Sequence, residues 1–112
     1  EQAQAFDDKL LARLEANGIH KLGAHHSDAQ AYDGVYLLKQ VMEAAGVTGD
    51  PAKVEEERAA ILAQMEGVVF DGIVGDDVCF DSNHDAELPG YVIEIKDGAW
   101  TKFAEASADT CE

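Results

Sequence analysis

The sequence predicts a small mixed α/β chain, in which three helices are followed by two or three short β-strands. Two observations carry this prediction. Apolar residues recur at helical spacing up to Met65, and from Gly67 onward they alternate or form short runs between turn residues. A chain of 112 residues that is 46% hydrophobic is also long enough for one domain with a modest core.

The first helix is expected to start near the N-terminus and to end at Asn17-Gly18, because glycine closes a helix in the left-handed conformation without strain. A loop from Ile19 to His26 should follow. The apolar residues of this helix fall on one face, and they are Phe6, Leu10, Leu11 and Leu14.

A second helix is expected to be capped by Ser27 or Asp28, since either side chain can accept hydrogen bonds from the free amides of the first turn. Gly46 should end it. Its apolar surface is wide, so other elements of the fold should pack against this helix on more than one side. The residues of that surface are Ala31, Tyr32, Val35, Tyr36, Leu38, Val41, Met42 and Ala45.

The third helix has the clearest start signal, because Asp50 can cap it and Pro51 suits the first helical position. The run Glu55–Glu57 is expected to be its solvated side. Its inner stripe should consist of Val54, Ile61, Leu62 and Met65.

Strands are expected after Gly67. Val78–Phe80 is one candidate, and Tyr91–Lys96 is the best strand in the chain, closed by the turn residues Asp97-Gly98. Trp100 and Phe103 follow, and Ala104–Glu112 is expected to be a weakly ordered tail.

The charge balance excludes several classes of partner. Eight Lys and Arg residues against 23 Asp and Glu residues give a net charge of −15. Such an acidic surface repels nucleic-acid phosphates and anionic membranes. The two cysteines, Cys79 and Cys111, allow one disulfide, and the sequence leaves open whether it forms.

Two segments could hold a metal ion, and each has a simpler interpretation. Asp81–Asp85 places oxygens at alternate positions, but Ala86 and Val92 stand where a calcium-binding EF-hand loop needs Gly and Glu, so a hydrogen-bonded turn is favoured. The stretch His20–Asp28 holds three histidines and Asp28 without helical metal-ligand spacing, so a polar loop is favoured over a metal-dependent enzyme. No catalytic residue, metal ligand or cofactor is assigned.

Two longer segments resemble a known family. AYDGVYLLKQVMEAAGVTGDPAKVEEERAAIL is similar to a tyrosine-bearing helix, an Ala-Gly turn and a second helix. FDGIVGDDVCFDSNHDAELPGYVIEIKDGAW is similar to F-x-G-x-x-G-x-x-x-F-D-x-x-G-D followed by a strand and K-D-G-x-W, with four residues rather than three between Gly75 and Phe80. In this order they resemble the C-terminal third of type I periplasmic solute-binding proteins, the branched-chain amino-acid (Leu/Ile/Val-binding-type) receptors of ABC transporters. His84 departs from the pattern, since the family usually has Gly there, and it should adopt a strained turn conformation. The matching positions are Tyr32, Asp33, Ala45, Gly46, Phe70, Gly72, Gly75, Phe80, Asp81, Asp85, Lys96, Asp97, Gly98 and Trp100.

The resemblance implies an α/β fold that is an incomplete two-lobe clamp. Residues 1–112 would be a single C-terminal segment of a longer protein. Within it, residues 1–89 would be mostly helices and a strand of the N-terminal lobe, residues 90–96 the third interlobe crossing strand, and residues 97–112 a tail. The chain opens at Glu1 with neither an initiator Met nor a signal peptide, which agrees with that expectation.

The resemblance also implies a function, which is non-enzymatic binding of an amino acid or a similar small solute in the periplasm for an ABC transporter permease. By position, the ligand-facing residues would be His26, Ser27, Asp28 and Tyr32. A sensor domain with the same clamp is the alternative. The chain alone, with half of the cleft absent, should bind ligand weakly and should self-associate, including by strand exchange through Tyr91–Ile95.

Overall fold

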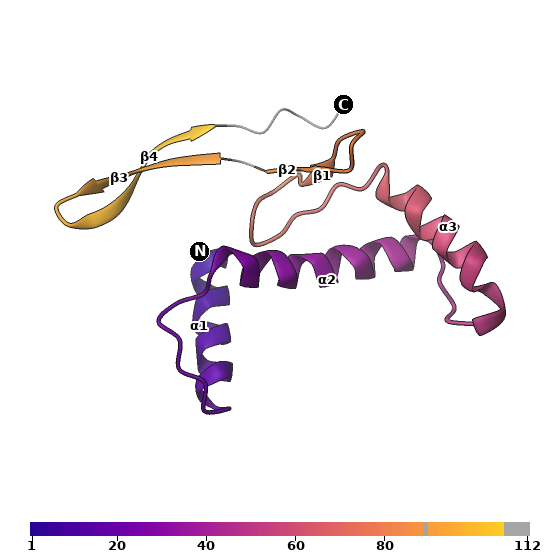
Figure 1. Cartoon of the computed structure of the whole chain (residues 1–112), viewed down its shortest axis with the longest axis horizontal. Coiled ribbons are helices and arrows are strands. Elements are labelled where there is room, and N and C mark those ends of the chain that lie inside the picture. Colours follow the sequence, from indigo (N-terminus) through magenta and orange to yellow (C-terminus); the bar gives the residue numbers. More distant parts are fainter. Residues whose placement is uncertain (89, 107–112) are drawn as a thin grey trace.

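The computed structural model describes residues 1–88 and 90–106, and these form three α-helices and four β-strands (Figure 1). The mixed α/β class predicted from the sequence is therefore confirmed at that level. The elements are α1 (Gln2–Glu15), α2 (His26–Ala44), the short 3-10 helix η1 (Pro51–Lys53), α3 (Val54–Met65), β1 (Cys79–Phe80), β2 (Ala86–Glu87), β3 (Gly90–Lys96) and β4 (Ala99–Ala106).

The first two helices end, and the third begins, where the sequence predicts. Gly18 has φ of 73° after α1 and Gly46 has φ of 67° after α2, so both take the left-handed conformation that glycine adopts without a Cβ penalty. At the start of η1, the Asp50 side chain accepts a hydrogen bond from the Ala52 amide at 2.9 Å. The prediction of Asp50 as a cap is confirmed, with η1 leading into α3.

The start of α2 corrects one expectation. The cap residue is His25, and the helix begins at His26, so Ser27 and Asp28 lie inside the first turn. The physical reason is a capping box, in which the Asp28 carboxylate accepts the His25 amide at 2.6 Å while the His25 side chain faces the amide of Asp28.

The inner stripe expected on α3 is only half correct. Ile61 and Met65 are partly buried, whereas Val54 and Leu62 are exposed. α3 contacts α2 along one side only, so the stripe that it buries is narrower than the apolar pattern of its sequence.

The strands form two separate antiparallel pairs, β1 with β2 and β3 with β4. Asp97 and Gly98 have φ of 52° and 79°, which is the left-handed pair of a two-residue hairpin turn. β4 was not predicted, and Ala104–Ala106, expected in a weakly ordered tail, pair with β3. Residues 107–112 of that tail lie outside the described residues.

The small core lies between α2 and the segment that runs from Val68 to Cys79. Phe70 and Val78 face each other in a bridge whose two N–H···O distances are both 2.9 Å. Val41 of α2 is 1% exposed. The buried apolar residues among those described are Val41, Val68, Phe70, Val78 and Cys79.

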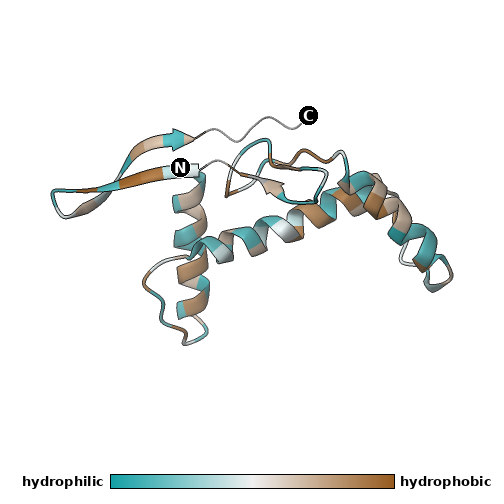
Figure 2. Ribbon diagram, turned by 45° about the horizontal axis from the view of Figure 1, so that its top comes forward, coloured by the Kyte–Doolittle hydropathy of each residue, from teal (hydrophilic) through white to brown (hydrophobic). Residues whose placement is uncertain are grey.

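The described chain is extended rather than compact. Its radius of gyration is 17.5 Å, against about 13 Å for a compact domain of this length. Its accessible surface is 8598 Å², against about 6000 Å² for a folded monomer of 12.0 kDa. Figure 2 shows hydrophobic segments in the outlying β3–β4 hairpin as well as along the helices. Apolar surface is therefore left uncovered within this chain.

None of the described helices combines the length and the hydropathy needed to cross a bilayer.

Candidate functional site

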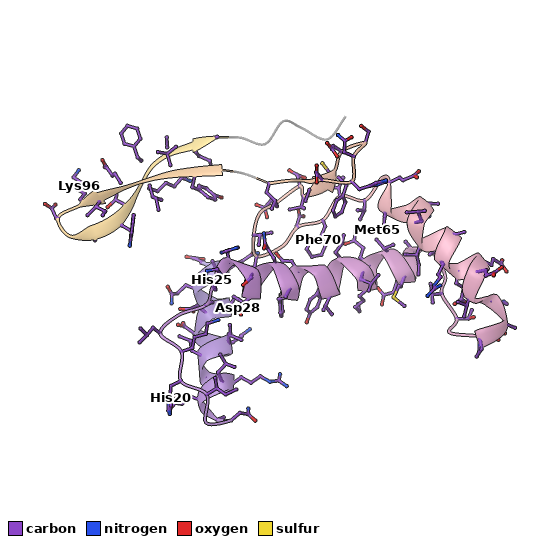
Figure 3. The ribbon with its side chains drawn as sticks, in the orientation of Figure 1. His20, His25, Asp28, Met65, Phe70 and Lys96 are labelled. Carbon is purple, nitrogen blue, oxygen red and sulfur yellow. The ribbon has the colours of Figure 1, made fainter. Side chains whose placement is uncertain are left out.

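A cluster of polar contacts lies at the start of α2, where Figure 3 labels His25 and Asp28. Besides capping His25, the Asp28 carboxylate forms an ion pair with Lys21 from the preceding loop. The Lys21 ammonium, followed by the His25 amide, lowers the pKa of Asp28 from its ordinary 3.8. Asp28 therefore stays ionised at neutral pH and is already occupied by groups of this chain.

The histidines near this start do not converge on one point. His20 lies at the far end of the loop, where its Nδ1 is 2.8 Å from Oε2 of Glu15 (Figure 3). The His25 and His26 rings stack with centroids 4.0 Å apart, and His25 Nδ1 is 3.1 Å from the Ser27 hydroxyl. Across residues 1–88 and 90–106, no group of three or more His, Cys, Asp or Glu side chains is placed to hold a metal ion.

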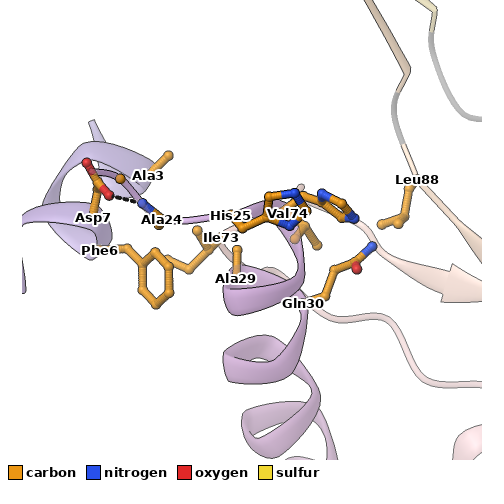
Figure 4. A pocket seen from close by; sticks show the side chains of 12 residues that line it. Ala3, Phe6, Asp7, Ala24, His25, Ala29, Gln30, Ile73, Val74 and Leu88 are labelled. Carbon is orange, nitrogen blue, oxygen red and sulfur yellow. Dashed lines mark hydrogen bonds between the residues drawn. The ribbon is translucent and has the colours of Figure 1, made fainter. Parts of the chain in front are cut away.

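Two hollows meet where α1, the start of α2 and Ile73 come together. The first has a volume of about 410 Å³ and is drawn in Figure 4, where the Asp7 carboxylate of α1 accepts the Ala24 amide. The second has a volume of about 530 Å³. Both are lined by Phe6 and Ile73, so these two side chains form the wall between them.

The four predicted ligand-facing residues are divided by this arrangement. His26 lines the first hollow and Tyr32 lines the second. Ser27 and Asp28 line neither hollow. Asp28 accepts the amide of the cap residue His25, and the Ser27 hydroxyl lies beside the His25 ring. The structure therefore brings the four residues into one neighbourhood but not into one cavity.

Tyr32 belongs to an aromatic row along α1 and α2. Its ring lies 5.2 Å from that of Phe6 and 4.7 Å from that of Tyr36, measured between centroids. The neighbouring Tyr36 hydroxyl raises the pKa of the Tyr32 phenol above 10.0, so this side chain remains neutral and can offer its hydroxyl as a hydrogen-bond donor.

The lining residues that were missed from the sequence include two polar ones at the start of α2. His25 and Gln30 both line the first hollow. Gln30 follows His26 by four positions, and residues at that spacing share a helix face, so the helical pattern could have found it. His25 was assigned to the preceding loop, and only the correct cap residue would have identified it.

A buried carboxylate anchors the loop that walls the site. Asp33 of α2 is 6% exposed, and its Oδ1 and Oδ2 accept the amides of Ile73 and Val74 at 2.9 and 2.8 Å. Gly72 passes so close that a Cβ added there would lie 2.5 Å from Asp33 Oδ2. Only glycine fits at this point, which explains the Gly72 of the F-x-G motif.

The Asp81–Asp85 segment forms a turn, as the sequence favours. Asp81 Oδ1 accepts the amides of Asn83 at 2.8 Å and Asp85 at 2.9 Å. These amides lower the pKa of Asp81 from 3.8, with Asp85 the largest cause. His84 has φ of 68°, so the predicted strained turn conformation is confirmed.

Cys79 is buried in the small core. Cys111, and with it the disulfide that the two cysteines allow, lies outside the described residues.

Comparison with models of known protein families, with curated proteins and with solved structures finds no match to this chain.

Proposed function

We propose that this chain is the C-terminal segment of a periplasmic solute-binding receptor that delivers an amino acid or a related small solute to an ABC transporter permease. The observation that supports it best is the tie between two motifs of the resemblance. Asp33, from the Tyr32-Asp33 helix motif, accepts the amides of Ile73 and Val74 inside the F-x-G-x-x-G segment, 40 and 41 residues away. Motifs that occur together by chance in a sequence have no reason to share a buried hydrogen-bonded anchor.

The chemistry at the start of α2 suits a small zwitterion. Amides at a helix N-terminus favour an anionic group, and the side-chain oxygen of Gln30, which lines the first hollow, can accept a hydrogen bond from an ammonium group. The first hollow, of about 410 Å³, adds polar side chains from His26 and Gln30 beside the apolar Phe6 and Ile73. A few polar groups in a mainly apolar hollow are typical of small-molecule sites.

The incomplete core agrees with a segment of a larger clamp. The accessible surface of 8598 Å² leaves about 2600 Å² more exposed than expected for a folded monomer of this mass. In a two-lobe receptor, strands of the longer chain would cover the exposed apolar side chains of α2 and α3. Half of the cleft would also come from them, so this chain alone should bind its solute weakly.

The proposed compartment makes a chemical prediction about the cysteines. The periplasm is oxidising, and disulfides form and persist there. Mass spectrometry of unreduced protein purified from the periplasm should therefore find the Cys79 and Cys111 peptides joined. Two free thiols, alkylated without prior reduction, would contradict export.

The direct test is ligand binding by the full-length protein encoded by the gene. A panel of amino acids is screened by thermal shift, and a hit is measured by calorimetry. His26→Ala and Tyr32→Phe should each weaken binding, while Ser82→Ala, in the distant Asp81–Asp85 turn, should leave it unchanged. If no amino acid or related solute binds, or if neither variant has an effect, the proposal is wrong. A signalling module fused to the clamp would instead support the sensor-domain alternative.

A further inference from the structure

The β3–β4 hairpin presents an apolar face that no described residue covers. Residues paired across antiparallel strands share a face, so Ile93 and Ile95 lie beside Lys102 and Trp100. Ile95 is 68% and Trp100 72% exposed, and every residue of β3 is exposed. Six residues form this surface, named here the hairpin face: Tyr91, Ile93, Ile95, Trp100, Lys102 and Glu105.

The hairpin face is electrically neutral in a strongly acidic chain. A register shift between Val92 and Ile93 brings Lys102 and Glu105 to the same side, where they form an ion pair. The Lys102 Nζ also lies 4.7 Å from the centroid of the Tyr91 ring. One positive and one negative charge therefore cancel on this face, whereas the whole chain carries −15. It is a surface on which two copies can meet without the repulsion that acts elsewhere.

A hairpin in this position needs a partner. Two strands alone are marginally stable in water, and they require further strands or a packed face. β3 and β4 pack chiefly against each other, and the ribbon shows them extending beyond the helices (Figure 1). Tyr91, Ile93, Ile95 and Trp100 of this face are 51%, 55%, 68% and 72% exposed, so most of its apolar surface is open to a partner.

We propose that two copies of this 112-residue chain associate through the hairpin face, in a two-fold arrangement that packs one hairpin against the other. Two-fold symmetry places the same surface on both sides of the contact, which suits a face that holds equal numbers of both charges. Lys102 of one copy can then approach Glu105 of the other. The proposal does not depend on the proposed function, since it concerns only this chain.

The test measures the mass of the purified chain across micromolar concentrations by sedimentation equilibrium. We expect twice 12.0 kDa. Ile95→Lys should raise the dissociation constant by about a hundredfold, because each copy loses the burial of one isoleucine and the effect occurs twice. Leu22→Lys is the matched control, since Leu22 is 106% exposed in the loop before α2, and it should leave the constant unchanged. Added salt should strengthen association by screening the overall repulsion.

Trp100 gives a readout that needs no variant. Its fluorescence should shift to shorter wavelength as concentration rises, because its 72% exposed ring becomes buried. A mass of 12.0 kDa at every concentration would overturn the proposal. So would a dimer that Ile95→Lys does not weaken but Val35→Lys, on the exposed side of α2, dissociates. Failure of ligand binding would leave this result untouched.

Discussion

Replacing Asp33 by Asn tests whether the buried carboxylate holds the Ile73–Val74 loop. The carboxylate accepts two amides at 2.9 and 2.8 Å, and it is 6% exposed, so water cannot replace it. Asparagine keeps the shape but turns one acceptor into an NH₂ group that faces an amide. One charge-assisted hydrogen bond is lost, at about 1.5–3 kcal/mol, and one buried N–H is left without an acceptor.

We therefore expect the free energy of unfolding to fall by about 2–3 kcal/mol for Asp33→Asn. Urea titration followed by circular dichroism at 222 nm measures it, at one fixed protein concentration because association would add to the apparent stability. The amides of Ile73 and Val74 should also lose protection from hydrogen exchange. Glu43→Gln, an equal loss of charge at an exposed site on the same helix, should cost less than about 0.5 kcal/mol. If the two variants were equally stable, the anchoring role of Asp33 would be refuted.

Three further predictions concern single sites. Gly72→Ala should lower the free energy of unfolding by about 1–3 kcal/mol, because the added Cβ would clash with the Asp33 carboxylate. Gly34→Ala has open space around it and should raise the free energy of unfolding by about 0.5–1 kcal/mol. Urea titration measures both. The Thr48 hydroxyl is the main group that lowers the pKa of Glu57 below its ordinary 4.5. The ionised Glu57 therefore stabilises the fold above pH 4.5, and this stabilisation is lost as the pH falls through the lower pKa of the folded state. Glu57→Gln should remove this part of the acid dependence of the melting temperature. His84→Gly should raise the melting temperature, because glycine adopts φ of 68° without strain, and an unchanged or lower melting temperature would contradict that reasoning.

Local signals predict the helices well because each end has its own chemistry. Asp50-Pro51, Gly18 and Gly46 act through backbone conformation and nearby amides, and such effects need no knowledge of the remaining fold. The cap of α2 was placed two to three residues too late because a capping box can be closed from the third helical position, and histidine was not considered as the cap.

Longer-range features were harder to predict. β4 was missed because Trp100 and Phe103 alternate poorly with their neighbours, since the register shift opposite Val92 and Ile93 disturbs the regular two-residue pattern. The exposure of Val54 and Leu62 on α3 was also misjudged. An apolar stripe predicts a buried helix face only where another element of the chain packs against it. For the candidate site, the family resemblance placed His26 and Tyr32 in one region, but it could not show that Phe6 and Ile73 divide that region into two hollows.

The central claim is that the chain is part of a larger solute receptor, and the coding DNA immediately upstream of Glu1 tests it most directly. The proposal predicts that the open reading frame continues for about 200–300 further residues, enough for the remainder of two ordinary α/β lobes, and begins with an export signal. A start codon directly before Glu1 would contradict it, and the chain would then be a separate domain of three helices and two strand pairs with some other function.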